Sequence, residues 1–218
     1  MTISTIDTGG GMTPDKEYSG RSRIRMFNCD CMELMKTGKW DLAIVDPPYR
    51  EKNDPDQWMR DKGGKMENFG KLPDDEYFKE LERVSTNFIC WGGNYFSDIL
   101  PPNNNWIIWY KMNDGVHFSM AEMAYSTIRK NVKVFHHLHN GVSGKIHPTQ
   151  KPVQLYKWLL TNYAKPGQAI LDTHGGSMSI AIACWDLGFD LDICELDKGY
   201  FDAAVKRFEG HISQQVLF

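Results

Sequence analysis

An apolar run that ends at two prolines places the strongest constraint on how this chain folds. Residues 42–45 (Leu-Ala-Ile-Val) form a continuous apolar segment, which is typical of a buried strand. Pro47 and Pro48 follow, and because proline has no backbone N–H, the segment cannot continue as a regular strand. Asp46 and Tyr49 flank the prolines, so a carboxylate and an aromatic ring lie at the carboxyl end of the strand. This pair suits a planar ligand with an amino group, although the segment could equally be a stiff loop whose tyrosine only packs.

Short apolar segments alternate with helical patterns along the rest of the chain. This alternation, with short connections, predicts a largely parallel sheet covered by helices on both faces. The expected strands are 23–28, 42–45, 87–91, 106–110, 122–128, 169–171 and 189–194, with a further candidate at 132–135. The expected helices are 31–36, 74–84, 95–100, 153–163, 177–187 and 198–208.

The domain organisation follows from composition. Residues 1–20 are polar and contain three consecutive glycines, which predicts a mobile N-terminal arm ahead of a single domain over 21–218. Residues 50–73 are polar and long for a structureless loop, which favours a lid or a loop that contacts the substrate. The five cysteines, without a signal peptide or an apolar run that could span a membrane, favour a reduced cytoplasmic protein. The spacing of Cys29, Cys31 and the histidines at 136, 137 and 139 fits no common zinc pattern, so no metal site is predicted.

The charges are unevenly distributed. Residues 123–171 contain seven lysines and arginines and no Asp or Glu, in a chain whose net charge is −3. A segment of one sign is a candidate surface for phosphates, and the alternative is a solvated surface that merely lacks acids. The candidate phosphate contacts are Arg129, Lys130, Lys133 and Lys145.

A second strand end has the features of a nucleoside site. Asp172 ends one expected strand, and Gly175-Gly176-Ser177 allows a tight turn beside a bound molecule. Glu195 ends the next strand, where an acidic side chain would bind a ribose diol. Because Asp172 would repel a pyrophosphate and suit a cation, the pattern favours S-adenosylmethionine over NAD. A tight turn with surface acids is the alternative interpretation.

Together these segments resemble the amino-group DNA methyltransferases of the permuted class, in which the catalytic motif precedes the cofactor motif. Residues 46–49 match the family's D-P-P-Y, and residues 147–152 match its H-P-x-Q-K-P. Residues 170–177 are similar to its cofactor loop, 194–197 to its ribose-binding segment, and 28–31 to the segment that meets the adenine of the cofactor. Residues 91–94 and 109–111 are similar to features of compact, phage-type members.

The resemblance implies a doubly wound, mostly parallel seven-stranded sheet of the S-adenosylmethionine-dependent, Rossmann-like type. Its catalytic half would span about 21–146 and its cofactor half about 147–210. The implied catalytic residues are Asp46, Pro47, Pro48 and Tyr49. The implied cofactor-binding residues are Asp30, Cys31, Asp46, His147, Gln150, Lys151, Pro152, Asp172, Thr173, His174, Gly175, Gly176, Ser177, Glu195 and Leu196.

This sequence departs from the family at its cofactor loop, which usually reads Asp-Pro-Phe-x-Gly-Ser-Gly. Thr173 and His174 replace Pro-Phe, and Met178 replaces the last glycine. We expect His174 to pack less tightly against the cofactor than phenylalanine does, and cofactor affinity to be lower.

The resemblance implies methyl transfer from S-adenosylmethionine to the N6 amino group of a flipped-out adenine in double-stranded DNA. The short span between Tyr125 and Ile146 leaves no room for a large recognition region, so a short or relaxed recognition sequence is expected. The implied setting is the cytoplasm of a bacterial or phage-infected cell, with a second copy of the chain and a cognate restriction endonuclease as candidate partners. The alternatives are N4-cytosine methylation, methylation of RNA or a small molecule, and a non-catalytic nucleic-acid-binding module.

Overall fold

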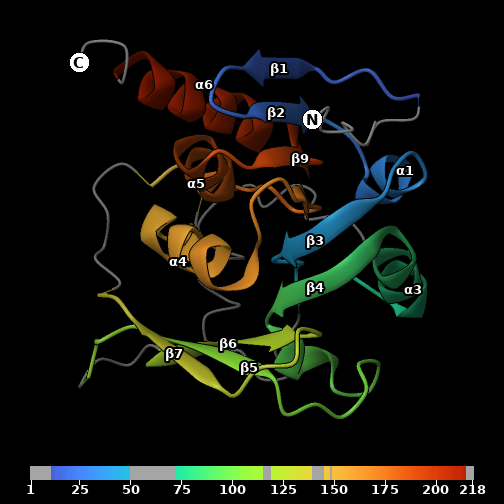
Figure 1. Cartoon of the computed structure of the whole chain (residues 1–218), viewed down its shortest axis with the longest axis vertical. Coiled ribbons are helices and arrows are strands. Elements are labelled where there is room, and N and C mark those ends of the chain that lie inside the picture. Colours follow the sequence, from blue (N-terminus) through green and yellow to red (C-terminus); the bar gives the residue numbers. More distant parts are fainter. Residues whose placement is uncertain (1–10, 50–71, 115–118, 139–144, 148, 215–218) are drawn as a thin grey trace, which may run out of the picture.

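The computed structural model describes residues 11–49, 72–114, 119–138, 145–147 and 149–214. These residues form one nine-stranded sheet in the order β1-β2-β9-β8-β3-β4-β6-β5-β7 (Figure 1). The strands are β1 (Lys16–Ser19), β2 (Arg23–Phe27), β3 (Trp40–Val45), β4 (Ser85–Trp91), β5 (Trp106–Tyr110), β6 (Ala121–Ser126), β7 (Lys133–His136), β8 (Ala169–Asp172) and β9 (Asp190–Cys194). The helices are α1 (Cys31–Met35), α3 (Asp75–Val84), the 3-10 helix η1 (Gly93–Phe96), α4 (Val153–Tyr163), α5 (Ser179–Leu187) and α6 (Lys198–Gln214).

The centre of the sheet is parallel, and its direction of winding reverses between β3 and β8. From β3 the chain passes through α3 to β4 on one side, and from β8 it passes through α5 to β9 on the other. β3 and β8 are themselves parallel neighbours, with Leu42 opposite Ile170. In open α/β sheets ligands bind beyond the carboxyl ends of the strands at such a switch point. Asp46 and Asp172 lie there.

Helices cover both faces of the sheet, as Figure 1 shows. Leu42 and Ile44 belong to one buried cluster, to which α4, α5 and α6 contribute. Ala43 and Val45 belong to a second cluster, to which α1 and α3 contribute. Successive side chains of a strand point to opposite faces, so a strand covered on both faces is apolar throughout. This explains the continuous apolar run at 42–45.

Side-chain caps fix where the helices near the site begin. The Asp74 carboxylate accepts the backbone N–H of Glu76 and of Tyr77 at the start of α3. The Asp30 carboxylate accepts the backbone N–H of Met32 at the start of α1. Each cap satisfies donors that the first helical turn leaves without a backbone partner.

The sheet is larger than the seven strands expected. The further candidate at 132–135 is confirmed as β7, and β1 adds a ninth strand inside the region expected to be a mobile arm. The alternating pattern of β1 is weak, because only Tyr18 among its four residues is a large apolar residue. Its ring contacts Phe208 of α6 edge-on, and its hydroxyl donates to Glu209. The ordered domain therefore begins before residue 20.

Other expected elements differ in detail or fall outside the description. The helix expected over 95–100 is the short 3-10 helix η1, which follows a left-handed Gly92. Helix α6 continues to Gln214, six residues beyond its expected end. Of the loop expected over 50–73, residues 50–71 lie outside the described residues. Among the described residues, no helix has both the length and the apolar character needed to cross a membrane.

Candidate active site

The carboxylate of Asp46 forms a close ion pair with Lys151 from a distant part of the sequence. Lys151 Nζ lies 2.5 Å from Asp46 Oδ2. Asp46 follows β3, and Lys151 lies just before α4, so the pair joins the two halves of the chain across the end of the sheet. The Lys151 side chain is only 4% exposed. An ammonium buried this far needs negative charge close by.

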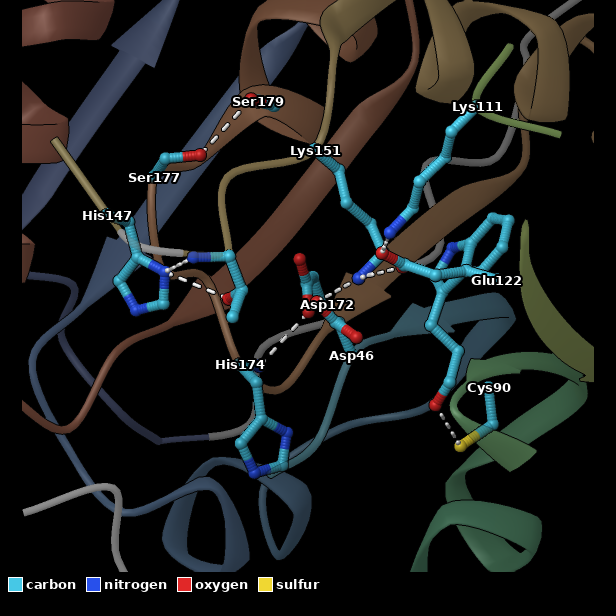
Figure 2. Close-up of polar contacts among 12 residues, drawn as sticks. Asp46, Cys90, Lys111, Glu122, His147, Lys151, Asp172, His174, Ser177 and Ser179 are labelled. Atoms are coloured by element: carbon cyan, nitrogen blue, oxygen red, sulfur yellow. Dashed lines mark hydrogen bonds and ion pairs between the residues drawn. The ribbon is translucent and has the colours of Figure 1, made fainter. Parts of the chain in front are cut away.

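That negative charge comes from two carboxylates. Lys151 Nζ also lies 3.3 Å from Glu122 Oε2, and the other oxygen of Glu122 lies 2.7 Å from Lys111 Nζ. Figure 2 shows Lys151 between Asp46 and Glu122, with Lys111 reaching Glu122 from a different segment. The four side chains thus form a chain of alternating charges, Lys111–Glu122–Lys151–Asp46.

Burial and charge act in opposite directions on the protonation of these groups. Burial raises the pKa of Asp46 and Glu122 raises it further, whereas Lys151 lowers it. Burial alone would raise the pKa of Glu122, but Lys151 and Lys111 lower it to about 2. Burial alone would lower the pKa of Lys151, but Asp46 and Glu122 raise it well above its usual value. At neutral pH Glu122 and Lys151 are therefore charged.

The tyrosine of the proline turn is held by a second aromatic ring. Tyr49 stacks on Tyr95 of η1, with ring centroids 4.2 Å apart and an angle of 12° between the planes. Gly92 makes this approach possible, because a Cβ atom there would lie 2.5 Å from Cε1 of Tyr49. Gly92 also has a φ of +67°, which favours glycine. Tyr95 is 39% exposed, so the stacked pair borders on solvent.

At the end of β8 a buried carboxylate begins the expected cofactor loop. Asp172 is 2% exposed, and its Oδ1 accepts the backbone N–H of His174 at 3.0 Å (Figure 2). Burial raises the pKa of Asp172 to about 8, the Asp46 charge adds to this, and the His174 N–H opposes it. No ion pair to Asp172 is formed within the part of the chain that the structure describes. Its ionised form would be stabilised by a cationic ligand.

The residues that depart from the family loop, Thr173, His174 and Met178, are held by contacts within this chain. Thr173 is buried, and its hydroxyl hydrogen-bonds Tyr77 Oη at 2.7 Å and His174 Nδ1 at 2.9 Å. The His174 ring lies edge-on to Tyr77, with centroids 5.6 Å apart. Burial lowers the pKa of His174 to about 4, so the ring is neutral at neutral pH. Met178 is fully buried with a φ of +51°, at the position where the family has glycine.

The turn of the cofactor loop contacts the acidic end of β9. Glu195 accepts the backbone N–H of Gly176 at 2.7 Å and that of Asp197 at 2.9 Å. The Gly175 N–H donates to the Cys194 carbonyl at 2.8 Å. Gly176 lies beside the His147 ring, whose atoms a Cβ atom there would meet at 3.6 Å. The structure therefore brings Gly175, Gly176, Glu195 and His147 together.

Several other expected site residues support this region. Gln150 is buried, and its side chain accepts the Ile146 N–H at 3.2 Å. Asp30 is exposed at the start of α1, with Cys31 half-buried after it, and Leu196 is 43% exposed. Pro47, which is buried, and Pro48, which is half-buried, follow Asp46 directly. Pro152 precedes α4. Ser177 is buried, and its hydroxyl lies 3.2 Å from that of Ser179.

The expected phosphate contacts are not gathered at this edge of the sheet. β6 begins at the site edge, where Glu122 lies, and runs away from it, so Arg129 and Lys130 follow its far end. β7 is parallel to β5 and begins there with Lys133. Lys130 donates to the Asn162 carbonyl and lies 4.7 Å from the centroid of the Tyr163 ring, at the end of α4. Of the four, only Lys145 lies close in sequence to the site, two residues before His147.

Five residues that sequence reasoning did not assign to the site lie in it. They are Tyr77, Tyr95, Lys111, Glu122 and Arg207. Glu122 comes from β6, whose position beside Asp46 depends on antiparallel pairing with β4 that no motif reveals. Tyr95 comes from η1, which follows β4, the parallel neighbour of β3. Arg207 of α6 donates to the Ser177 carbonyl at 2.7 Å and to the Ser179 hydroxyl at 3.0 Å. A weak signal for Glu122 was its place as the last acid before the acid-free segment.

Comparison with known proteins gives consistent matches. A family model described as DNA methylase, N6_N4_Mtase, matches residues 100–206. The type II methyltransferase M2.DpnII of Streptococcus pneumoniae is 23% identical over 261 residues, which cover 92% of this chain and 95% of the relative. The solved structure of the M1.HpyAVI–SAM complex has a TM-score of 0.61 at 20% identity, over 84% of this chain and 98% of that one. The cytosine-N4-specific PvuII DNA methyltransferase has the same TM-score at 13% identity, over 94% of each chain.

These matches agree with the geometry of the site. The two solved structures show that the fold is that of DNA methyltransferases. The segment matched by the family model contains Glu122, Lys151 and Asp172, which lie at the switch point beside Asp46. Residues 100–206 are thus similar to the N6/N4 DNA methylases, and the similarity to the type II relative extends over 92% of the chain.

Proposed function

We propose that this chain transfers a methyl group from S-adenosylmethionine to the N6 amino group of an adenine flipped out of double-stranded DNA. The observation that carries the proposal is the position of Asp46 and Tyr49 at the switch point, beside a second acidic strand end at Asp172. One strand end offers acceptors and a ring to an amino-bearing base. The other offers a carboxylate to a cationic cofactor.

The residues at the end of β8 fit S-adenosylmethionine. When bound, this cofactor supplies a methyl group on a positively charged sulfonium. Asp172 is a buried carboxylate without an ion pair among the described residues, and a nearby cation would stabilise its charge. Glu195 ends the neighbouring strand, and its carboxylate oxygens accept the N–H groups of Gly176 and Asp197. Each oxygen can accept a further hydrogen bond, so Glu195 would also bind the ribose hydroxyls. The M1.HpyAVI structure with the same fold is a complex with SAM.

The chemical role of Asp46 follows from the poor nucleophilicity of an aromatic amino group. Its lone pair is delocalised into the ring, so attack on a methyl group requires the nitrogen to become tetrahedral. Acceptors for the amino hydrogens favour this change and stabilise the positive charge that develops. The Asp46 carboxylate and the Pro47 carbonyl are the two acceptors, and proton loss follows transfer. Asp46 Oδ2 already accepts a hydrogen bond from Lys151. A carboxylate accepts several donors, so Asp46 can also accept one from the amino group.

Tyr49 supplies the flat surface for the base. A base inside the duplex is not reachable by a strand-end carboxylate, so the target nucleotide must flip out. Tyr95 now covers one face of Tyr49 at 4.2 Å, which shows that this ring accepts a parallel aromatic partner. A flipped base that stacks on Tyr49 would place its amino group near Asp46.

Sequence recognition and biological setting extend this proposal. The short segment between β6 and residue 146 supports a short or relaxed recognition sequence. The type II relative favours a restriction–modification setting with a cognate endonuclease, in a bacterial or phage-infected cell. A dimer of this chain would widen the surface that reads DNA, and sedimentation of the protein with and without duplex DNA tests it.

The decisive experiment supplies S-adenosylmethionine with a labelled methyl group and unmethylated duplex DNA, followed by nucleoside analysis. Label in N6-methyladenine is the expected result. Label in N4-methylcytosine would contradict the choice of adenine and favour N4-cytosine methylation. The PvuII enzyme, which has the same fold, is specific for that reaction. Label in neither nucleoside, with cofactor binding intact, would favour a non-catalytic module.

Substitution of Asp46 tests the catalytic assignment. We expect Asp46→Ala to lower the transfer rate by on the order of a hundredfold or more, because it removes an acceptor needed in the transition state. Binding of S-adenosylmethionine should persist, weakened on the order of tenfold by the loss of one negative charge, since Asp172 and Glu195 belong to other strands. Single-turnover rates and calorimetric binding measure the two effects, and Asp98→Ala on an exposed loop is the matched control. Equal transfer rates for variant and wild type would reject the assignment.

A further inference from the structure

We propose that Glu122 and Lys111 are positioning residues that keep the buried charge around Asp46 in balance, so that the site accepts a cationic cofactor. This inference rests on the proposed function and adds residues that the sequence motifs do not contain. The four charges alternate from Lys111 through Glu122 and Lys151 to Asp46, at 2.7, 3.3 and 2.5 Å. Two are positive and two are negative, so the group is neutral.

Glu122 holds Lys151 in place. The Lys151 side chain is 4% exposed and Glu122 is 25% exposed, so water screens this contact little. The Lys151 ammonium also lies 5.5 Å from the centroid of the Trp91 ring. Carboxylates on two sides and a ring on a third define one position for Nζ. Because Asp46 pairs with that ammonium, Glu122 indirectly fixes the orientation of the Asp46 carboxylate.

Glu122 also cancels the charge of Lys111. The Lys111 side chain is 12% exposed and lies 5.4 Å from the centroid of the Trp109 ring. Without Glu122, Lys111 and Lys151 would be two largely buried cations beside the single charge of Asp46. The proposed reaction brings a sulfonium to this region and creates positive charge on the amino nitrogen, and an excess positive charge opposes both.

A purely mechanical role is the competing explanation. Glu122 and Trp109 are paired across the ladder of β5 and β6, so the contact with Lys111 could simply brace these strands. Charge balance and bracing differ in what happens when both partners are removed. Removal of both restores neutrality but abolishes the brace.

The experiment compares Glu122→Gln, Lys111→Met and the double variant, with Glu17→Gln on the exposed β1 as the control. Calorimetry measures the dissociation constants of S-adenosylmethionine and of its neutral thioether product, S-adenosylhomocysteine. We expect Glu122→Gln to weaken binding of the sulfonium on the order of tenfold, and binding of the thioether much less, because only the former is charged at sulfur. Lys111→Met should bind the sulfonium at least as tightly as wild type. The double variant should return to within about threefold of wild type.

The pH profile gives a second readout that a brace would not change. Burial raises the pKa of Asp46, Lys151 lowers it, and the Glu122 charge raises it further. Removing the Glu122 charge should therefore move the acidic limb of the transfer rate to lower pH. Equal weakening of both ligands, or a double variant worse than either single one, would overturn the inference. If the wild-type chain binds the cofactor with this charge preference but methylates no DNA, the proposed function fails while the role of Glu122 stands.

Discussion

At the scale of single residues, the site depends on one glycine that no conservative change can replace. Gly92 has a φ of +67°, and the Tyr49 ring lies where its Cβ would be. Substitution by alanine would add backbone strain and push Tyr49 away from its stack with Tyr95. The orientation of the ring that we propose receives the base therefore depends on the turn after β4.

We expect Gly92→Ala to lower the rate of methyl transfer at least on the order of tenfold, because a displaced ring no longer orients the base. Cofactor binding should be unchanged, because Asp172 and Glu195 lie at the ends of β8 and β9 and not in the turn after β4. Gly167→Ala is a matched control, with a φ of +82° and no atom within 4 Å of the added Cβ. Gly167→Ala introduces the same backbone strain at a positive φ, but its Cβ atom meets no neighbouring side chain. Similar losses of transfer in both variants would show that backbone strain alone is responsible.

The sequence predicted the residues at strand ends better than their partners. Asp46, Asp172 and Glu195 follow apolar runs, so their place at one edge of a parallel sheet could be inferred. Glu122 could not be placed, because its strand is antiparallel to β4 and the sequence does not specify that pairing. The ion pair of Lys151 with Asp46 was not predicted, because the sequence does not show which carboxylate the lysine meets.

At the scale of elements, α6 holds the proposed cofactor loop from outside. Arg207 donates to the Ser177 carbonyl and to the Ser179 hydroxyl, where the loop enters α5. Met178 lies between these two residues with a left-handed backbone and a buried side chain. The loop thus keeps its turn without the usual glycine because packing and Arg207 hold it.

We expect Arg207→Met to weaken cofactor binding several-fold and to lower the free energy of unfolding by about 1–2 kcal/mol, since two acceptors lose their donor. Calorimetry and urea denaturation measure the two effects. The control is Lys206→Met, on the exposed side of the same helix. If Arg207→Met destabilised the fold but left cofactor affinity at the wild-type value, the helix would not be controlling the loop.

Element prediction failed where the pattern was weak. The alternating pattern predicted β2 and the apolar runs predicted β3, β4, β8 and β9, because these strands are buried. β1 is an edge strand with mostly exposed side chains, so its sequence resembles that of a loop. The acid-free segment predicted a single basic surface, but the course of β6 and β7 places Arg129, Lys130 and Lys133 toward the edge opposite Asp46, whereas Lys151 lies beside Asp46.

At the scale of the whole molecule, the proposed cofactor site lowers the stability of the free protein. Asp172 is buried in the core at the end of β8, and its pKa is raised to about 8, chiefly by burial. Because the folded state favours the protonated form, Asp172 is compatible with the fold at low pH. Its contribution becomes unfavourable as pH rises from its usual pKa toward about 8. A cationic cofactor would remove this cost, so the same carboxylate that destabilises the free protein would favour the complex.

Asp172→Asn tests this trade-off, because asparagine keeps the acceptor for the His174 N–H but carries no charge. We expect the variant to melt several degrees above wild type at about pH 8.5, and to differ little at about pH 3, which is below the pKa of Asp172 in both the folded and the unfolded state. Added S-adenosylmethionine should raise the melting temperature of wild type more than that of the variant, because the variant lacks the charge that the sulfonium requires. Thermal unfolding at both pH values, with and without cofactor, measures all four conditions. A melting difference that does not change with pH would mean that the Asp172 charge is already compensated within the protein, and that the site does not depend on a cationic ligand.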